Sequence, residues 1–547
     1  MKFLTKFMAA VCLATGLTAC SSEDGPGTEP TPEPQSGFYS QITFRLPQGS
    51  RSTASEGNEV GQNDENNVGS ILVVLATQES AGADYKFLTY SLNDSPITGG
   101  NNTTHTIVFQ DRDKLFAQAN NTVHIFAYCN PTEELRAVVE GLAEGASFID
   151  EICSANVTGT WKSNGFLMTS AELASKQLPD EATLRTYNTP THAFPLGEVQ
   201  VMRTASRFDF RDASSEIEVD EANEAYTQSG ANTYPIFDQN RVNEAGKHPL
   251  VAEVTFTRVA LFNIRNQFYY LPRISTVASE GTPAAVTLCP GKLGMETAGT
   301  YVVCPDEATY SYILPDAIDP LNPAAAGLEW AELNTVLGNT ENNKDGWGND
   351  LEASKKNYHI WRYGIENAFG AIESVDKKAT TGYVFEAEIK PREGFGNVKE
   401  DGTLEVMYLY NNVMYGSAAH IAAEVENYPV STLATAFKAA FTETDGVYTP
   451  VDDETLKANG FTAYKPNAEG KYLCYYFAYN KHNEDGDPTS VGLMEFGTVR
   501  NNIYKLAVTS VKKFGSFEPG NPDDWNVYFT LDIRVLDWTV RINNLEF

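Results

Sequence analysis

The longest regular pattern in this chain lies near its C-terminal end, over residues 527–542. Apolar side chains recur there at every second position, which is the period of a β-strand with one buried face. The apolar positions change from odd to even numbers near Asp537, and a strand accommodates such a change by a bulge or by a break into two segments. A long strand with an apolar face promotes aggregation if it is left unpaired. The pattern therefore requires a partner, which is either the chain's own sheet or another molecule.

Most of the remaining apolar segments also predict strands, because β-branched and aromatic residues dominate them. These segments are residues 68–76, 106–109, 123–128, 199–210, 254–264, 383–389, 404–410, 472–479 and 504–511. Helical periodicity is confined to residues 135–142 and 430–441. Strands joined by long polar connections are typical of β-sandwiches with Greek-key topology. We therefore expect a mainly β protein with a few short helices.

A weak internal repeat favours two equivalent domains. In each half of the chain, an aromatic strand that ends in asparagine precedes an arginine-led strand. The paired segments are residues 123–130 with 201–210, and 475–480 with 499–508. A chain of 547 residues is also too long for one compact core. We place the boundary near residue 275, which gives domains at residues 52–275 and 276–547.

The net charge of −32 limits the partners of this protein. Residues 1–51 carry four basic and four acidic side chains, so the rest of the chain keeps the charge of −32. An acidic surface disfavours nucleic acid and anionic lipid as binding partners. We therefore expect no nucleic acid partner, and we expect membrane contact only through an attached lipid.

The N-terminal segment predicts export and lipid attachment. Residues 2–17 combine two lysines with a short apolar stretch, which is an export signal because it is too short to span a bilayer. Residues 17–20, Leu-Thr-Ala-Cys, resemble the bacterial lipobox, in which the signal is removed and the new N-terminal cysteine is acylated. We expect residues 1–19 to be the signal peptide and Cys20 to carry the lipid.

Residues 20–51 continue from the lipid-attachment cysteine with a tether, one strand and a loop that contains an arginine. A polar tether over residues 21–37 is too rich in Pro, Gly and Glu to build a core. A strand with alternating polar and apolar positions follows the tether, and its apolar face consists of Phe38, Ile42, Phe44 and Leu46. The polar loop after this strand contains Arg51 and Ser52, and proteolytic nicking concentrates in exposed loops of this kind.

The sequence contains no recognisable catalytic pattern. It has no paired histidines at zinc-ligand spacing, no nucleophile elbow and no phosphate-binding loop. Residues 345–350 and 485–487 could hold calcium, although turn formation explains their Asp-Gly pairs equally well. Cys289 and Cys304 could form a disulfide across a loop. We expect no enzymatic activity, no cofactor and no metal.

Three C-terminal segments together resemble the type V pilus subunits, the fimbrillins. They are residues 471–483 (KYLCYYFAYNKHN), 494–506 (MEFGTVRNNIYKL) and 535–547 (VLDWTVRINNLEF). Residues 50–51 with 59–68 also look like the mature N-terminus of that family. The similarity is greatest to the major subunit of short fimbriae. The resemblance implies two transthyretin-like Greek-key β-sandwich domains in tandem.

The family resemblance also implies a mechanism of assembly. Such subunits are exported as lipoproteins to the outer membrane and are cut after a loop arginine by an arginine-specific protease. By position this residue is Arg51, with Arg45 as the second candidate, so the resemblance makes residues 20–51 a lipidated propeptide that is removed. The cut removes the strand at residues 38–46 and opens a groove, which the C-terminal strand of a neighbouring subunit fills by β-augmentation. This contact joins subunits head to tail, so it propagates as a filament.

The resemblance therefore implies a stalk subunit of a fimbria on the cell surface. Its partners would be identical subunits, anchor and tip subunits, and the arginine-specific protease. The side chains expected to fill the groove are Leu531, Ile533, Val535, Leu536, Trp538, Val540 and Ile542. Two alternatives remain open at this point. One is a tip or accessory subunit of a fimbria, and the other is a monomeric surface lipoprotein that binds glycan and is never cleaved.

Overall fold

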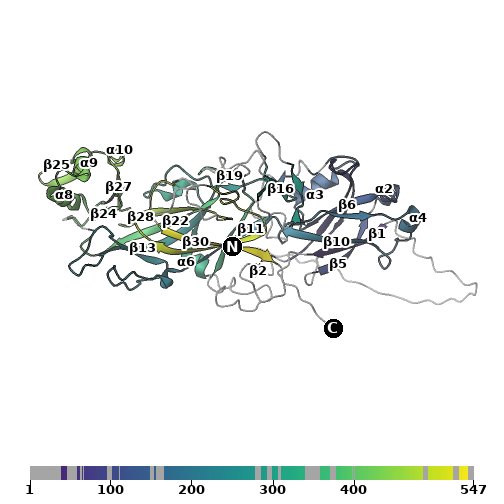
Figure 1. Ribbon diagram of the computed structural model, residues 1–547, viewed down its shortest axis with the longest axis horizontal. Coiled ribbons are helices and arrows are strands. Elements are labelled where there is room, and N and C mark those ends of the chain that lie inside the picture. Colours follow the sequence, from purple (N-terminus) through teal and green to yellow (C-terminus); the bar gives the residue numbers. More distant parts are fainter. Residues whose placement is uncertain are drawn as a thin grey trace, which may run out of the picture. The chain divides into compact units, whose positions relative to one another are not determined.

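The protein is mainly β, as predicted (Figure 1). The computed structural model describes residues 38–45, 58–61, 65, 67–94, 102–109, 111–147, 149, 153–154, 165–276, 285–291, 299–305, 310–338, 358–369, 377–396, 398–399, 401–483, 491–520 and 529–539. Among the helices in these ranges, none has the length and apolar character needed to cross a membrane.

The first sheet is built only from residues that precede Thr204. Its strand order is β4-β3-β6-β8-β10-β1-β5, and β9 also pairs with β6. The strands are β1 (Phe38–Arg45), β3 (Ile71–Thr77), β4 (Lys86–Asn93), β5 (Asn102–Phe109), β6 (Thr122–Cys129), β8 (Met168–Ser170), β9 (Ala174–Gln177) and β10 (Phe194–Arg203). The sheet curls so that its two edge strands, β4 and β5, approach each other. A hydrogen bond joins them, from the Ser91 hydroxyl on β4 to the Val108 carbonyl on β5 (2.8 Å).

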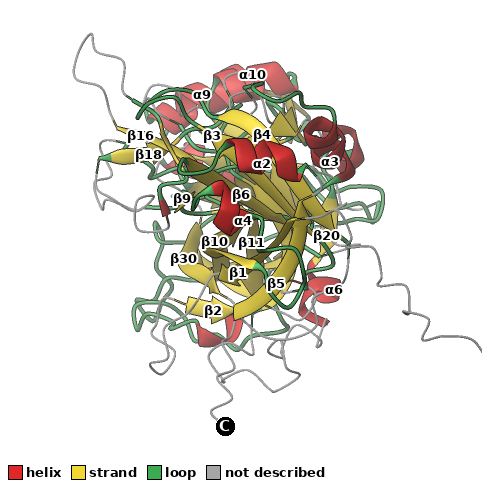
Figure 2. Cartoon of the chain, turned by 90° about the vertical axis from the view of Figure 1, so that its right-hand side faces the viewer, coloured by secondary structure: helices red, strands yellow, loops and turns green. Residues whose placement is uncertain are grey.

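Both faces of this sheet are buried, which explains the continuous apolar run of β3. Val73 and Leu75 belong to one hydrophobic cluster, whereas Leu72 and Val74 belong to another on the opposite face. Helices α2 (Arg112–Ala117) and α4 (Glu181–Leu184) pack on the first cluster, and α3 (Glu133–Glu140) packs on the second. Figure 2 shows these three helices beside the sheet.

The second half of the structure contains two five-stranded sheets that pack face to face. One has the order β2-β30-β29-β11-β21, and the other has the order β12-β13-β22-β28 with β20 on β13. The strands are β2 (Asn58–Val60), β11 (Ala205–Arg211), β12 (Thr233–Phe237), β13 (Leu250–Phe262), β20 (Trp330–Glu332), β21 (His359–Ile365), β22 (Gly382–Pro391), β28 (Tyr472–Tyr479), β29 (Asn502–Val511) and β30 (Phe529–Thr539).

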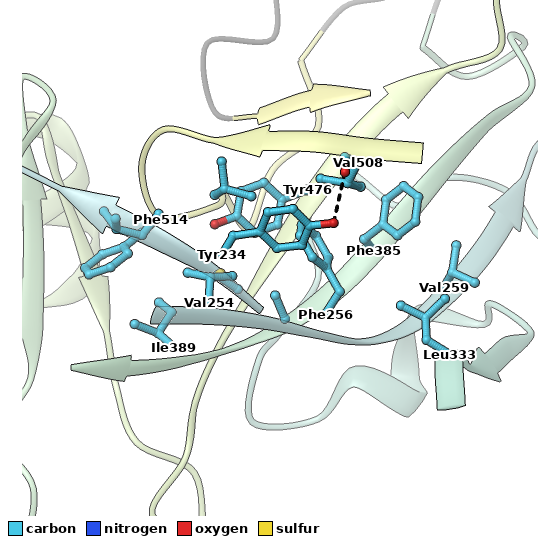
Figure 3. Packing of buried hydrophobic residues seen from close by; sticks show 14 of the residues in the cluster. Tyr234, Val254, Phe256, Val259, Leu333, Phe385, Ile389, Tyr476, Val508 and Phe514 are labelled. Atoms are coloured by element: carbon cyan, nitrogen blue, oxygen red, sulfur yellow. Dashed lines mark hydrogen bonds between the residues drawn. The ribbon is translucent and has the colours of Figure 1, made fainter. Parts of the chain in front are cut away.

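Aromatic side chains fill the space between these two sheets (Figure 3). Phe256 and Phe385 lie edge to face with ring centroids 5.5 Å apart, and Tyr234 packs against Phe256 at 5.3 Å. The Tyr234 hydroxyl crosses to the opposite sheet and donates a hydrogen bond to the Val508 carbonyl (2.9 Å). The core is therefore largely apolar, and the buried Tyr234 hydroxyl has a hydrogen-bond partner.

A smaller lobe is inserted between β22 and β28, which are themselves paired strands. It contains β23 (Met407–Tyr410), β24 (Val413–Tyr415), α8 (Ala418–Asn427), α9 (Thr432–Ala440), β25 (Phe441–Thr444), β26 (Val447–Pro450), α10 (Asp453–Ala458) and β27 (Phe461–Tyr464). The Ser431 hydroxyl caps α9 by accepting a hydrogen bond from the Ala434 amide (3.1 Å), and Leu433 and Phe437 are buried on one face of the helix. The helix predicted at residues 430–441 is thus confirmed.

Short elements connect the sheets. They are β7 (Cys153–Ser154), β14 (Ile264–Arg265), β15 (Phe268–Tyr269), β16 (Arg273–Thr276), β17 (Thr287–Leu288), β18 (Thr300–Val302), β19 (Tyr310–Ser311), α6 (Leu333–Gly338) and two 3-10 turns, Ser214–Glu216 and Pro323–Ala326.

The single strand predicted at residues 199–210 is in fact two strands in different sheets. β10 ends at Arg203 in the first sheet, and β11 begins at Ala205 in a sheet of the second half. Thr204 marks the change, where its amide and hydroxyl both donate to the Leu167 carbonyl (3.1 and 3.2 Å). The chain thus passes from the first sheet into a sheet of the second half at Thr204. The domain boundary near residue 275 stays a prediction.

The repeated arginine-led strands are neighbours. β11 and β29 pair in parallel, with Phe208 opposite Tyr504, and these two rings stack at 5.3 Å. The two halves of the repeat therefore contribute to one sheet.

Candidate assembly site

The strand expected to be removable, β1, occupies the interior of the first sheet. It runs parallel to β10, with Ser40 opposite Phe194, and antiparallel to β5, with Phe38 opposite Phe109. Both backbone edges of β1 are therefore hydrogen-bonded. Removal of such a strand would expose one edge of β10 and one edge of β5, which together form a template for a replacement strand.

The predicted apolar face of β1 is buried. Phe38, Ile42 and Phe44 have exposed fractions of 1%, 0% and 2%. The Phe38 ring lies 6.1 Å from the ring of Phe116 and 6.0 Å from that of Phe194. These contacts place the side chains in the hydrophobic cluster enclosed by the curled sheet. The predicted alternation holds from Ser40 to Arg45, whereas Tyr39, which was expected on the polar face, is also buried.

The groove that β1 fills is almost free of polar partners. Ser40 lies on the same face, and its hydroxyl has no hydrogen-bond partner among the described residues. His105 on β5 lies beside Phe44 with ring centroids 6.0 Å apart, and burial lowers the pKa of this histidine. A neutral imidazole suits an apolar groove. Sequence reasoning missed His105, Phe116 and Phe194 because nothing local indicates that their segments lie beside β1.

The two candidate cleavage positions differ in their surroundings. Arg45 is the last residue of β1, where its backbone lies opposite Asn102 on one side and Gln200 on the other. Its exposed guanidinium forms an ion pair with Glu198. A protease binds its substrate as an extended segment that is free of other pairing. The pairing of Arg45 with both neighbouring strands therefore disfavours cleavage at this residue. The remaining residues expected at this site, Cys20, Leu46, Arg51 and Ser52, lie outside the described residues.

The expected donor strand is paired within its own subunit. β30 runs antiparallel to β29 from Phe529 to Asp537, and β2 pairs in parallel with its end, from Asp537 to Thr539. Leu531, Ile533, Val535, Leu536 and Trp538 lie in β30, whereas Val540 and Ile542 lie outside the described residues. Over the described residues, β1 and β30 belong to different sheets and do not pair with each other.

The predicted bulge or break near Asp537 is wrong for the described strand. β30 continues through Asp537, and the register irregularity lies instead between Val508 and Ser510 on β29. Asp537 is the residue at which β30 changes neighbours, because its pairing with β29 ends there and its pairing with β2 begins. The change in the apolar pattern thus coincides with a change of neighbour in an unbroken strand.

Cys289 and Cys304 are free thiols in this structure. They follow β17 and β18, which pair with opposite edges of β16, so one strand separates them. Two strand spacings amount to about 10 Å, which is beyond the Cα separation of a disulfide. Within the described ranges, no group of His, Cys, Asp and Glu side chains could hold a metal ion. The possible calcium segments, residues 345–350 and 485–487, lie outside those ranges.

The C-terminal strands decide the family. Residues 470–544 match the family described as major fimbrial subunit protein type IV, fimbrillin, C-terminal. This match covers β28, β29 and β30, which carry the motifs quoted above. The C-terminal part of the chain is therefore that of a fimbrillin. A search of curated proteins finds no matching relative.

Several solved structures resemble this fimbrillin over most of its length. A candidate cell adhesion protein from Parabacteroides distasonis has a TM-score of 0.40 and 10% identity, covering 93% of this chain and 99% of its own. The fimbrilin FimA from Porphyromonas gingivalis gives 0.37 and 10%, covering 92% and 99%. The tip fimbrial protein Mfa3 from the same organism, truncated at its C-terminus, gives 0.35 and 8%, covering 92% and 100%. The family assignment does not depend on these distant likenesses.

The C-terminal match indicates the general character of the protein. Fimbrillins are structural, non-enzymatic subunits of cell-surface fimbriae, so the expectation that this chain is not an enzyme is confirmed. It also implies assembly with other fimbrial subunits.

Proposed function

We propose that this fimbrillin is the major stalk subunit of its fimbria, exported as a lipoprotein on Cys20, cleaved after Arg51 and polymerised by strand exchange. The observation that carries the proposal is the position of β1. An N-terminal strand with three buried apolar side chains lies between β10 and β5, and the arginine loop follows it in the chain. Loss of this strand leaves a groove for a neighbour's C-terminal strand.

The pairing of Arg45 supports Arg51 as the cleavage residue. Cleavage after Arg45 would require a protease to detach the end of β1 from both adjacent strands. Cleavage after Arg51 leaves Ser52 as the new N-terminus and frees the whole of β1. The expected donor side chains are those on the alternating faces of residues 531–542, from Leu531 to Ile542.

The experiment is limited digestion of the purified precursor with an arginine-specific protease. We expect wild type and Arg45→Ala to yield a ladder of oligomers on gels, with Ser52 as the new N-terminal residue by mass spectrometry. Arg51→Ala should remain an intact monomer. A wild-type subunit that is cut after Arg51 yet remains a monomer would refute strand exchange and favour the glycan-binding surface lipoprotein.

A second experiment tests separately the C-terminal strand as the donor and the groove left by β1 as the acceptor. A cleaved subunit that lacks residues 526–547 should not form ladders, and a synthetic peptide of residues 527–547 should bind its empty groove. The same peptide added to wild type should shorten the ladder by capping free grooves. If the truncated subunit polymerised as wild type does, the C-terminal strand would not be the donor.

The stalk role and the lipid anchor have separate tests. A stalk subunit forms long homopolymers alone, whereas a tip or accessory subunit stops at the end of a filament made by another subunit. For the anchor, cells supplied with labelled palmitate should incorporate label into wild-type precursor and not into Cys20→Ser.

A further inference from the structure

Strand β2 joins the two ends of the proposed mature subunit. Its residues Asn58–Val60 pair in parallel with Asp537–Thr539 of β30. In sequence, β2 begins shortly after the proposed cleavage residue, Arg51. Asp537 is held on both sides, by Asn58 on β2 and by Asn502 on β29. The last described part of the C-terminal strand is therefore held by the segment that would become the new N-terminus.

A buried carboxylate, that of Glu65, anchors the chain five residues after the end of β2. Glu65 has an exposed fraction of 0%. Its carboxylate accepts hydrogen bonds from the Arg207 guanidinium (3.1 Å) and the Tyr363 hydroxyl (2.7 Å), and the Arg203 guanidinium donates to its backbone carbonyl (3.1 Å). Arg203 ends β10 and Arg207 lies in β11, so Glu65 is bound where the two sheets meet.

Glu65 contributes a buried carboxylate to a cluster of buried charges. Arg207 also forms paired hydrogen bonds with Asp209 (2.9 and 2.8 Å), and Arg203 and Arg207 are both fully buried. Two buried guanidinium groups thus face two buried carboxylates. Removing Glu65 would take away a carboxylate that binds the buried Arg207 guanidinium, and breaking a buried ion pair is costly in the interior of a protein.

A second anchor lies a few residues further along. The Asn130 side-chain carbonyl accepts a hydrogen bond from the Gly69 amide (2.7 Å), and its amide group donates to the carbonyls of Asn67 (2.7 Å) and Phe166 (2.9 Å). The chain from β2 to β3 is therefore fixed at β30, at Glu65 and at Asn130. Loss of the propeptide would leave all three contacts intact.

We infer that β2, anchored by Glu65, is a clasp that keeps β30 in its own subunit during assembly, so that the donated segment begins after Thr539. Of the donor side chains proposed above, only Val540 and Ile542 would then pass to the neighbour. This inference rests on the proposed strand exchange and makes Glu65 a positioning residue for the donor. Donating β30 itself would require separation from β29 over Phe529–Asp537 and from β2 over Asp537–Thr539. The clasp also fixes the point from which the donated segment leaves its subunit.

The first test locks the clasp covalently. Asn58→Cys with Asp537→Cys places two thiols at directly paired positions, and the strand spacing of about 4.8 Å lies within disulfide range. We expect the pair to bridge in the uncleaved precursor. After cleavage, the oxidised subunit should form ladders at the same rate as the reduced one.

The possible outcomes of this test are distinct. Failure of the two cysteines to bridge refutes the β2–β30 pairing. An oxidised subunit that stays monomeric while its reduced form makes ladders refutes the fixed clasp, because β30 must then leave β2. If wild type makes no ladder either, strand exchange and the donor part of the inference fail together, while the bridge still reports on the pairing.

The second test measures the anchor without polymerisation. In the uncleaved precursor, Glu65→Gln should raise hydrogen exchange at the amides of residues 537–539 roughly tenfold by loosening β2. The matched control is Glu386→Gln, because Glu386 is also buried (4% exposed) and binds Arg258 (2.7 Å) in the other sheet. It should leave exchange at residues 537–539 unchanged. Equal exchange in wild type and folded Glu65→Gln would overturn the role of Glu65.

Discussion

Ile42 gives the simplest measure of how strongly burial of its apolar side chains stabilises β1 in the first sheet. It is completely buried and lies at the middle of β1, with strands on both sides. Its face carries no charge, so its contribution to stability comes from burial and packing.

We predict that Ile42→Ala destabilises the uncleaved precursor by about 2–5 kcal/mol, because it leaves a cavity in a closed core. Urea unfolding of the precursor measures this change. Thr43→Ala on the opposite, partly exposed face is the control and should cost less than about 1 kcal/mol. If β1 departs on cleavage, the assembled filaments of Ile42→Ala and wild type should be equally stable.

His482 makes the C-terminal half sensitive to acid. Its ring nitrogen Nδ1 lies 3.0 Å from the Tyr504 hydroxyl, and burial lowers the pKa of His482 to about 4. In the unfolded chain the pKa of histidine is about 6.5. The unfolded state therefore binds more protons below pH 6.5, so stability falls as the pH drops from about 6.5 towards 4.

We predict that this histidine accounts for at most about 3 kcal/mol of stability lost on acidification, since part of the residue stays accessible to water. The measurement is the free energy of unfolding at pH 7, 6, 5 and 4. His482→Gln, which can keep the bond to Tyr504, should flatten this dependence, and the exposed His192→Gln should not. Identical pH profiles for all three proteins would contradict the assignment.

At the scale of elements, two asparagines explain the weak repeat in the sequence. Asn130 follows β6 and Asn480 follows β28, and both side chains bind backbone groups of later segments. The Asn480 amide group donates to the Gly497 carbonyl (2.6 Å) and to the Thr498 hydroxyl (3.2 Å). Each asparagine thus ties the end of an aromatic strand to a later segment of the chain.

We predict that Asn480→Ala costs about 2–4 kcal/mol, because it removes these hydrogen bonds and the acceptor of the buried Tyr383 hydroxyl. Thermal or urea unfolding checks the value. Asn121→Ala, at an exposed position, should stay within about 0.5 kcal/mol of wild type. If Asn480→Ala lowered the free energy of unfolding as little as the control does, the hydrogen bonds of Asn480 would not contribute to stability.

For the whole molecule, charge opposes assembly. The chain carries −32, and removal of residues 1–51 leaves that value unchanged. Cleaved subunits therefore repel one another, and the repulsion reaches about 30 Å in 0.01 M salt but only about 8 Å at 0.15 M.

We predict that ladder growth after cleavage accelerates roughly tenfold between 10 and 150 mM NaCl. Gel densitometry over time measures growth, and the loss of precursor in the same samples corrects for any effect of salt on the protease. Growth that slows with added salt would show instead that attraction between opposite charges drives the contact.

The sequence by itself determined the local properties of this protein. The mainly β class, the limits of most strands and the buried face of β1 follow from the alternation of side chains, which is written into consecutive residues. The predicted strands at residues 472–479 and 504–511 correspond closely to β28 and β29. The helix at residues 135–142 corresponds to α3, where Leu135 and Val139 are buried one turn apart.

Only the tertiary structure decided which strands meet. The position of β1 between β10 and β5, the change of sheets at Thr204, and the pairing of β2 with β30 join residues that are far apart in the chain. A period-two pattern shows which face of a strand is buried but not against which partner. Likewise, Glu65 looks like any surface carboxylate in the sequence, and it becomes an anchor only because Arg203, Arg207 and Tyr363 converge on it from three strands.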